Sequence, residues 1–134
     1  RDYSLSYKMP FLLAFIRHVD SIGDAKIEEI LEDYIAFYQD RITRGLPVDR
    51  STCPYNETML QDKKAMQRSM LTNPFEKFER KRFLYYSKDL SVISMNHALY
   101  SQMEAGDWER VRRQMEEDLA EYYAKVEGAV LVKR

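Results

Sequence analysis

Eight basic side chains between residues 63 and 88 have the types and spacing best suited to a definite chemistry. They are Lys63, Lys64, Arg68, Lys77, Arg80, Lys81, Arg82 and Lys88, and only Glu76 and Glu79 oppose them, so this segment has a net charge of +6. Cations hold nucleic-acid phosphates, and bases are recognised by forked donors or by stacking on aromatic rings. Arg80, Lys81 and Arg82 directly precede an aromatic segment that contains Tyr85. We therefore predict a nucleic-acid contact here, with a solvated rim over an aromatic core as the alternative.

The remaining charge is distributed unevenly along the chain. Residues 20–40 contain seven acidic side chains and one lysine, a net charge of -6. The whole chain of 134 residues has 21 basic and 22 acidic side chains and a formal net charge of -1. The molecule is not a polycation, so strong non-specific binding of nucleic acid by bulk charge is not expected, and binding would require a local basic surface.

Residues that could support catalysis do not form a recognisable constellation. His18 and His97 fall on different predicted elements, and neither has a partner at the spacing of a metal site. Cys53, the single cysteine, excludes an intrachain disulfide and lacks an adjacent basic group that would activate its thiol. Solvation explains the acidic residues on the outer face of the last helix, which are Glu116, Glu117, Asp118 and Glu121. The glycines form no phosphate loop, so we predict a non-catalytic chain without cofactor or metal.

Hydrophobic periodicity predicts the elements that must position the basic segment. Helices are expected over about 7–19, 25–44 and 57–72, followed by a short helix after 73–76, strands over 83–86 and 92–95, and a last helix from 107. The first helix is apolar on most sides and is predicted to be central, with Pro10 in its first turn. An apolar stripe from Trp108 to Val126 predicts packing of the last helix on the first two, with a protein-binding groove as the alternative.

Capping residues set the expected helix boundaries. Asp24 is predicted to be the N-cap of the second helix, and Asp107 that of the last. Asn73 is predicted to cap the short helix, with Pro74 at its first position and Glu76 completing a capping box.

The element order predicts a mainly α fold with one small β-hairpin. Three helices followed by a two-stranded ribbon are typical of a winged-helix domain, here with an extra C-terminal helix. Residues 1–134 are expected to form a single domain, and the start at Arg1 without an initiator methionine favours a fragment of a larger protein. No apolar run approaches the ~18 residues of a membrane span and no secretory pattern is present, which favours a cytoplasmic location without a membrane partner.

Three stretches resemble the C-terminal region of large bacterial DEAD/DEAH-box helicases of the restriction type, similar to the helicase subunit of type III restriction systems. The stretches are Phe37–Arg50, Leu71–Leu84 and the opening Ser6–Leu13. The resemblance extends from about Tyr7 to Tyr100 and does not include the last helix. The ATPase motifs of that family are absent from this sequence, so no catalytic residue is transferred. The resemblance implies a non-catalytic appendage that helps an upstream, ATP-binding motor in the same chain to hold or recognise DNA.

The leading hypothesis is therefore an accessory domain that contacts nucleic acid, with DNA as partner and a helicase or restriction-type ATPase as parent protein. The alternative is a protein-interaction or scaffolding domain that docks through the acidic second helix and the charged last helix. A small stand-alone enzyme is the third and weakest hypothesis.

Overall fold

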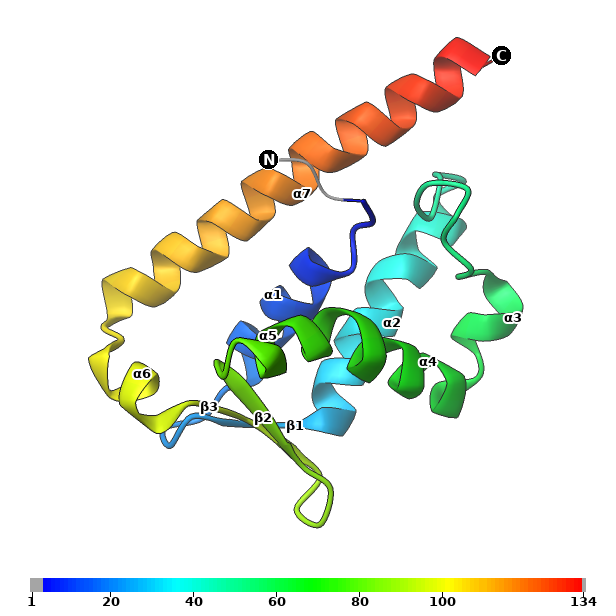
Figure 1. Ribbon diagram of the computed structural model, residues 1–134. Coiled ribbons are helices and arrows are strands. Elements are labelled where there is room, and N and C mark those ends of the chain that lie inside the picture. Colours follow the sequence, from blue (N-terminus) through cyan, green and yellow to red (C-terminus); the bar gives the residue numbers. More distant parts are fainter. Residues whose placement is uncertain (1–3, 134) are drawn as a thin grey trace.

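The computed structural model describes the backbone of residues 4–133 and the side chains of residues 4–129 (Figure 1). The predicted mainly α fold with a small β-hairpin and a separate C-terminal helix is confirmed. In chain order the elements are α1 (Lys8–His18), β1 (Asp24–Lys26), α2 (Ile27–Thr43), α3 (Glu57–Leu60), α4 (Lys63–Met70), the π-helix η1 (Leu71–Phe75), α5 (Glu76–Arg80), β2 (Leu84–Ser87), β3 (Val92–Met95), α6 (His97–Gln102) and α7 (Ala105–Lys133). The strands form an antiparallel sheet in the order β1-β3-β2.

Helix α1 lies at the centre of the molecule, as its apolar sequence predicts. Its Phe11 and Phe15 side chains are buried with Tyr34 of α2, whereas Met9 is buried against α7. Figure 1 shows α1 between these two longer helices. Pro10 lies in the first turn of α1, where its missing N–H removes no helical hydrogen bond. Burial on both sides of α1 makes it the element that joins α7 to the rest of the core.

Strand β1 replaces the predicted first turn of the second helix. Asp24 is not an N-cap; it pairs with Ser94 of β3, and its carboxylate accepts a hydrogen bond of 2.6 Å from the Ser94 hydroxyl. The helix begins at Ile27 instead, with Lys26 at the N-cap position and no side-chain cap. The prediction was wrong because pairing with β3 satisfies the backbone of residues 24–26, and a strand of three residues is too short to show an alternating pattern.

The predicted helix over 57–72 is divided in two. Asn56 caps α3 by accepting a hydrogen bond from the backbone N–H of Met59, and Asp62 caps α4 by accepting one from that of Ala65. Asparagine and aspartate are both favoured at N-cap positions. Because Asp62 caps a second helix, two helices stand where hydrophobic periodicity predicted one.

The predicted helix restart at residues 73–76 is absent. The helical run instead continues from α4 through η1 into α5, and Asn73 and Pro74 lie inside η1. Glu76 does not complete a capping box, because no helix begins at Asn73; its carboxylate pairs with Arg80 one turn later at 3.2 Å.

Side-chain hydrogen bonds explain why the helix tolerates Pro74. Proline cannot donate the backbone hydrogen bond of a helix interior, and a wide π turn accommodates this loss. The Thr72 hydroxyl donates to the carbonyl oxygen of Arg68 at 2.8 Å, and the Asn73 amide donates to that of Ser69 at 2.8 Å. Ser69 lies five residues before Pro74, so its carbonyl oxygen is the one that would accept the missing proline N–H in a π turn, and the Asn73 amide supplies a donor there instead. The run from α4 through η1 to α5 therefore stays continuous.

The predicted hairpin is confirmed and leads into the two C-terminal helices. Leu84 and Ile93 are buried beneath the sheet, and the loop at Ser91 adopts a left-handed conformation with φ of 54°. Asp107 is not the N-cap of α7, which begins at Ala105; its carboxylate accepts a hydrogen bond from the backbone N–H of Glu104. It thereby satisfies a free N–H at the helix start from a position inside the first turn.

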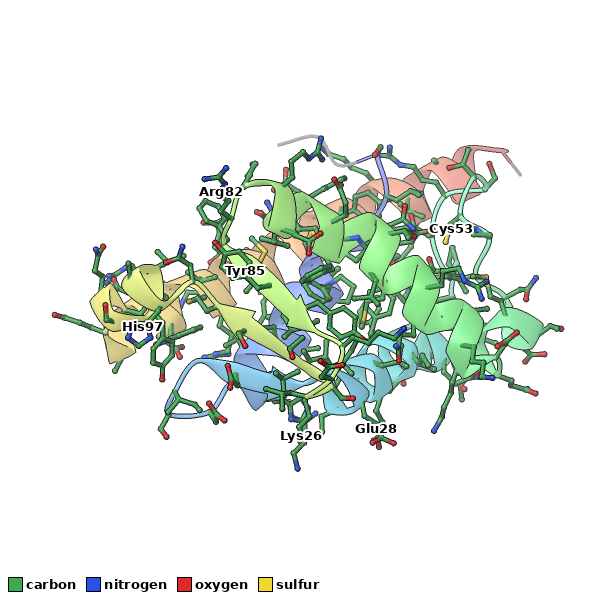
Figure 2. The ribbon with its side chains drawn as sticks, turned by 60° about the horizontal axis from the view of Figure 1, so that its bottom comes forward. Lys26, Glu28, Cys53, Arg82, Tyr85 and His97 are labelled. Carbon is green, nitrogen blue, oxygen red and sulfur yellow. The ribbon has the colours of Figure 1, made fainter. Side chains whose placement is uncertain are left out.

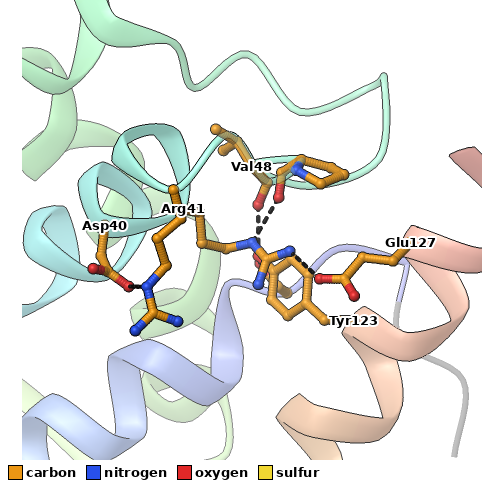
Figure 3. A network of polar contacts seen from close by, with 8 residues as sticks. Asp40, Arg41, Val48, Tyr123 and Glu127 are labelled. Carbon is orange, nitrogen blue, oxygen red and sulfur yellow. Dashed lines mark hydrogen bonds and ion pairs between the residues drawn. The ribbon is translucent and has the colours of Figure 1, made fainter.

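A network of polar side chains fastens α7 to the core. The guanidinium of Arg41 donates to the carbonyl oxygen of Pro47 at 2.6 Å, pairs with Glu127 at 2.8 Å, and lies 3.6 Å from the centroid of the Tyr123 ring (Figure 3). The apolar stripe of α7 packs against side chains of α1 and α2, as the sequence predicts for the last helix, and the ion pair adds a polar contact to α2.

The carboxylate of Asp49 is the most heavily used acceptor near this network. It accepts hydrogen bonds from the backbone N–H and the hydroxyl of Ser6 and from the hydroxyl of Tyr122. Burial and hydrogen bonding to this carboxylate raise the pKa of Tyr122 well above its ordinary value.

We predict that Asp49→Asn destabilises the fold, because one acceptor oxygen becomes a donor that faces groups which also donate. The free energy of unfolding should fall by about 2 kcal/mol in urea denaturation. Asp40→Asn is the matched control: Asp40 forms an exposed ion pair with Arg44, and its loss should cost less than about 1 kcal/mol. Equal effects of the two substitutions would contradict this role of Asp49.

Candidate nucleic-acid interface

The side chains predicted to contact nucleic acid are all accessible to solvent. The eight basic residues are each exposed, and Tyr85 retains 43% of its accessible surface. Within the described part of the chain, Arg80 is the only one of the eight that forms an ion pair, an exposed i,i+4 pair with Glu76. The acidic segment of α2 therefore neutralises none of these cations by direct pairing among the described residues.

The basic residues form two groups at opposite ends of one helical run. Lys63, Lys64 and Arg68 lie on α4, and we call them the α4 group. The α5 group consists of Lys77 and Arg80 on α5 with Lys81 and Arg82 in the turn that follows. The helical rise of 1.5 Å per residue separates the two ends by about 25 Å. The structure brings together four cations next to the hairpin rather than all eight.

Lys88 belongs to neither group. It lies in the β2–β3 loop, which is joined to the start of α2 by a hydrogen bond of 2.9 Å from the backbone N–H of Ile27 to the carbonyl oxygen of Ser91. The first turn of α2 contains the exposed residues Glu28 and Glu29. Figure 2 shows Glu28 at one edge of the molecule and Arg82 at the other, with the hairpin between them. The hairpin loop therefore lies beside acidic side chains.

Tyr85 lies next to the α5 group. In β2 its neighbour Leu84 is buried whereas Tyr85 faces solvent, as the alternation of a strand requires. The Tyr85 hydroxyl and the Asn96 amide both donate to the carbonyl oxygen of Arg82, each at 3.2 Å. Arg82 itself has a φ of 62°, in the left-handed region that non-glycine residues rarely adopt. These two bonds hold the turn that displays its guanidinium (Figure 2).

Sequence reasoning missed a cleft beside the α5 group. The cleft has a volume of about 360 Å³, and its walls include Lys8 at the start of α1, Lys77, Lys81 and the rings of Phe78 and Phe83. Phe83 was assigned to a strand, but it precedes β2 and retains 44% of its accessible surface. The four-residue spacing of the two lysines could have indicated one shared face.

His18 and Cys53 take structural positions, whereas His97 is exposed at the start of α6. His18 bridges two helices: its ring nitrogens lie 2.8 Å from a carboxylate oxygen of Asp33 and 3.1 Å from one of Glu29. Cys53 is half-buried and accepts a hydrogen bond of 3.4 Å from the Tyr7 hydroxyl. In residues 4–129 no group of three or more histidine, cysteine, aspartate or glutamate residues could hold a metal ion.

None of the helices in the described residues has both the length and the apolar character that crossing a lipid bilayer requires. The chain matches no protein-family model, no curated protein and no solved structure.

We predict that the Cys53 thiol reacts slowly with a disulfide reagent such as dithiobis(nitrobenzoic acid). Burial raises its pKa, so less thiolate is present at a given pH, and the reagent has restricted access. The rate in mildly alkaline buffer should be at least about tenfold below that of the urea-unfolded protein, which is the control. A folded-state rate above the control would indicate an activated thiol and favour the enzyme hypothesis.

Proposed function

We propose that this chain is a winged-helix-like accessory domain that contacts nucleic acid through the α5 group and Tyr85. The order α1, β1, α2, the α4–α5 run, β2 and β3, with the strands paired as β1-β3-β2, supports the winged-helix assignment. In such domains the helix before the ribbon lies in a groove of the nucleic acid. Here that helix is the α4–α5 run, whose exposed face is basic.

The observation that carries the proposal is the group of four exposed cations at the end of this helix. Lys77, Arg80, Lys81 and Arg82 lie within six consecutive residues, and only Arg80 has an acidic partner in the described residues. Cations in such a row suit successive phosphates of one strand. The exposed ring of Tyr85 adds a surface on which a base or sugar can pack.

The acidic side chains favour one mode of approach. The hairpin loop with Lys88 lies beside Glu28 and Glu29, which repel phosphates. The nucleic acid would therefore lie along α5 and the turn at Arg82, and the hairpin loop would contribute less than it does in a typical winged helix.

The parent protein in this proposal is a bacterial, cytoplasmic ATP-dependent helicase of the restriction type, in agreement with the sequence resemblance. ATP binding and hydrolysis would belong to motor domains upstream in the same chain. This domain would hold DNA near the motor and would need no cofactor of its own.

A protein-interaction domain is the second candidate, and one observation favours it. Two shallow depressions between α1, α2 and α7 share Leu13 and Phe37 in their walls, and Leu119 extends the apolar surface onto α7. A stable homodimer in light scattering that disappears on Leu119→Glu would support this candidate.

We predict that the triple substitution Arg80→Glu, Lys81→Glu, Arg82→Glu weakens binding of a short DNA duplex at least about tenfold at low salt. It should also reduce the slope of log affinity against log salt by about 0.9 for each phosphate that the variant no longer neutralises. Fluorescence anisotropy over a range of salt concentrations measures both quantities.

The matched control reverses the charge of three exposed arginines away from the α5 group: Arg17 on α1, Arg44 just after α2, and Arg113 on α7. Each pairs with one acidic side chain that is itself exposed or partly exposed. The control changes the net charge equally and should leave the affinity within about twofold of the wild type. Equal weakening by both triple variants would mean that overall charge, rather than the α5 group, governs binding.

A further inference from the structure

The cleft beside the α5 group has fixed walls. On one side, the Tyr7 hydroxyl donates to Cys53 and the Tyr7 ring stacks on that of Tyr55, with centroids 4.8 Å apart. On the other side, the backbone N–H of Phe83 donates to the carbonyl oxygen of Phe78 at 2.9 Å. A cleft held in this way is present before any ligand arrives, and its volume of about 360 Å³ is within the range of small-ligand sites.

Two lysines supply positive charge at this cleft. Lys77 and Lys81 lie one helical turn apart, both are exposed, and neither forms an ion pair with a carboxylate in the described residues. Lys8 at the start of α1 also lines the cleft, with its ammonium nitrogen 5.8 Å from the centroid of the Phe78 ring. This arrangement suits an anion with the size of a phosphate group.

Two aromatic rings, Phe78 and Phe83, form the apolar part of the cleft. Phe78 is partly buried and packs against Phe11 with centroids 5.9 Å apart, so its position is fixed by the core. Phe83 is exposed, although a large apolar ring gains most free energy from burial. A flat ligand that stacks on Phe83 would cover this exposed ring, and nucleobases stack on aromatic side chains in many single-strand binding sites.

We propose that this cleft receives one unpaired nucleotide of a nucleic-acid strand, with its phosphate at Lys77 and Lys81 and its base against Phe83. The proposal rests on the nucleic-acid contact proposed above and adds the form of nucleic acid that is bound. A paired base is stacked inside its duplex and cannot enter such a cleft, so the site selects a single-stranded segment or end. Arg80 and Arg82 would hold the phosphates on either side of that nucleotide.

The test uses a short oligodeoxythymidylate with one 2-aminopurine, a base whose fluorescence is quenched by stacking, and a blunt duplex of the same length. Wild-type protein should quench the single strand and bind it more tightly than the duplex. Phe83→Ala should weaken single-strand binding about tenfold and abolish the quenching, while duplex binding changes less than twofold. Phe83→Trp keeps a stacking ring and should restore both signals.

Leu90→Ala is the matched control, because Leu90 is 72% exposed and lies in the hairpin loop outside the cleft. It should leave binding and quenching unchanged, and thermal unfolding of each variant verifies the fold. The cleft proposal alone would be overturned if duplex binding depended on the α5 group while single-strand binding and quenching were insensitive to Phe83→Ala. Absence of binding to either probe at low salt would overturn the proposed function and the cleft proposal with it.

Discussion

The Asp49 carboxylate is the interaction on which the arrangement of the other parts depends. It joins three segments that are distant in sequence: the N-terminal segment through Ser6, the loop after α2 in which it lies, and α7 through Tyr122. A partly buried carboxylate needs such donors, and the hydroxyls would in turn lack a partner without it. Ser6 directly precedes Tyr7 and Lys8, which line the cleft. The Asp49 carboxylate therefore stabilises both the fold and one wall of the candidate site.

The second constraint is the proline inside the basic helix. A regular restart at Pro74 would separate α4 from α5 and allow the two groups of cations to point in unrelated directions. The π turn, supported by the side chains of Thr72 and Asn73, keeps one helical run instead. Pro74 and Phe75 stay buried in that run while Lys77 and Arg80 remain in solvent. The wide turn therefore sets which face of α5 carries the cations and lines the cleft.

Features that depend on nearby residues could be predicted from the sequence. The periodicity of α1, α2 and α7, the hairpin, and the exposure of the basic residues are properties of short segments, and the structure agrees with each of them. Features that depend on distant residues could not. Strand β1 exists because Asp24 pairs with Ser94, and the cleft exists because Lys8 and Lys81, which are distant in sequence, line the same hollow. Asn73 was misassigned because an asparagine side chain can bond to nearby backbone in either sense. As an N-cap it would accept a hydrogen bond from a backbone N–H, whereas here its amide donates to the carbonyl oxygen of Ser69.

Under the proposed function, the separation of charge would allow a nearly neutral molecule to bind a polyanion. A net charge of -1 gives little long-range attraction to phosphates, so encounter in solution would be slow compared with that of a basic protein. Binding would instead depend on short-range contacts with the few cations around Arg82. The acidic start of α2 lies at another edge of the molecule, away from the proposed nucleic-acid contact. Such a surface suits a domain to which a strand is delivered by a motor in the same chain, because tethering supplies the local concentration that net charge does not. The cleft would then bind one nucleotide of the DNA strand that the motor supplies. Such binding would need neither high affinity nor a catalytic residue in this domain.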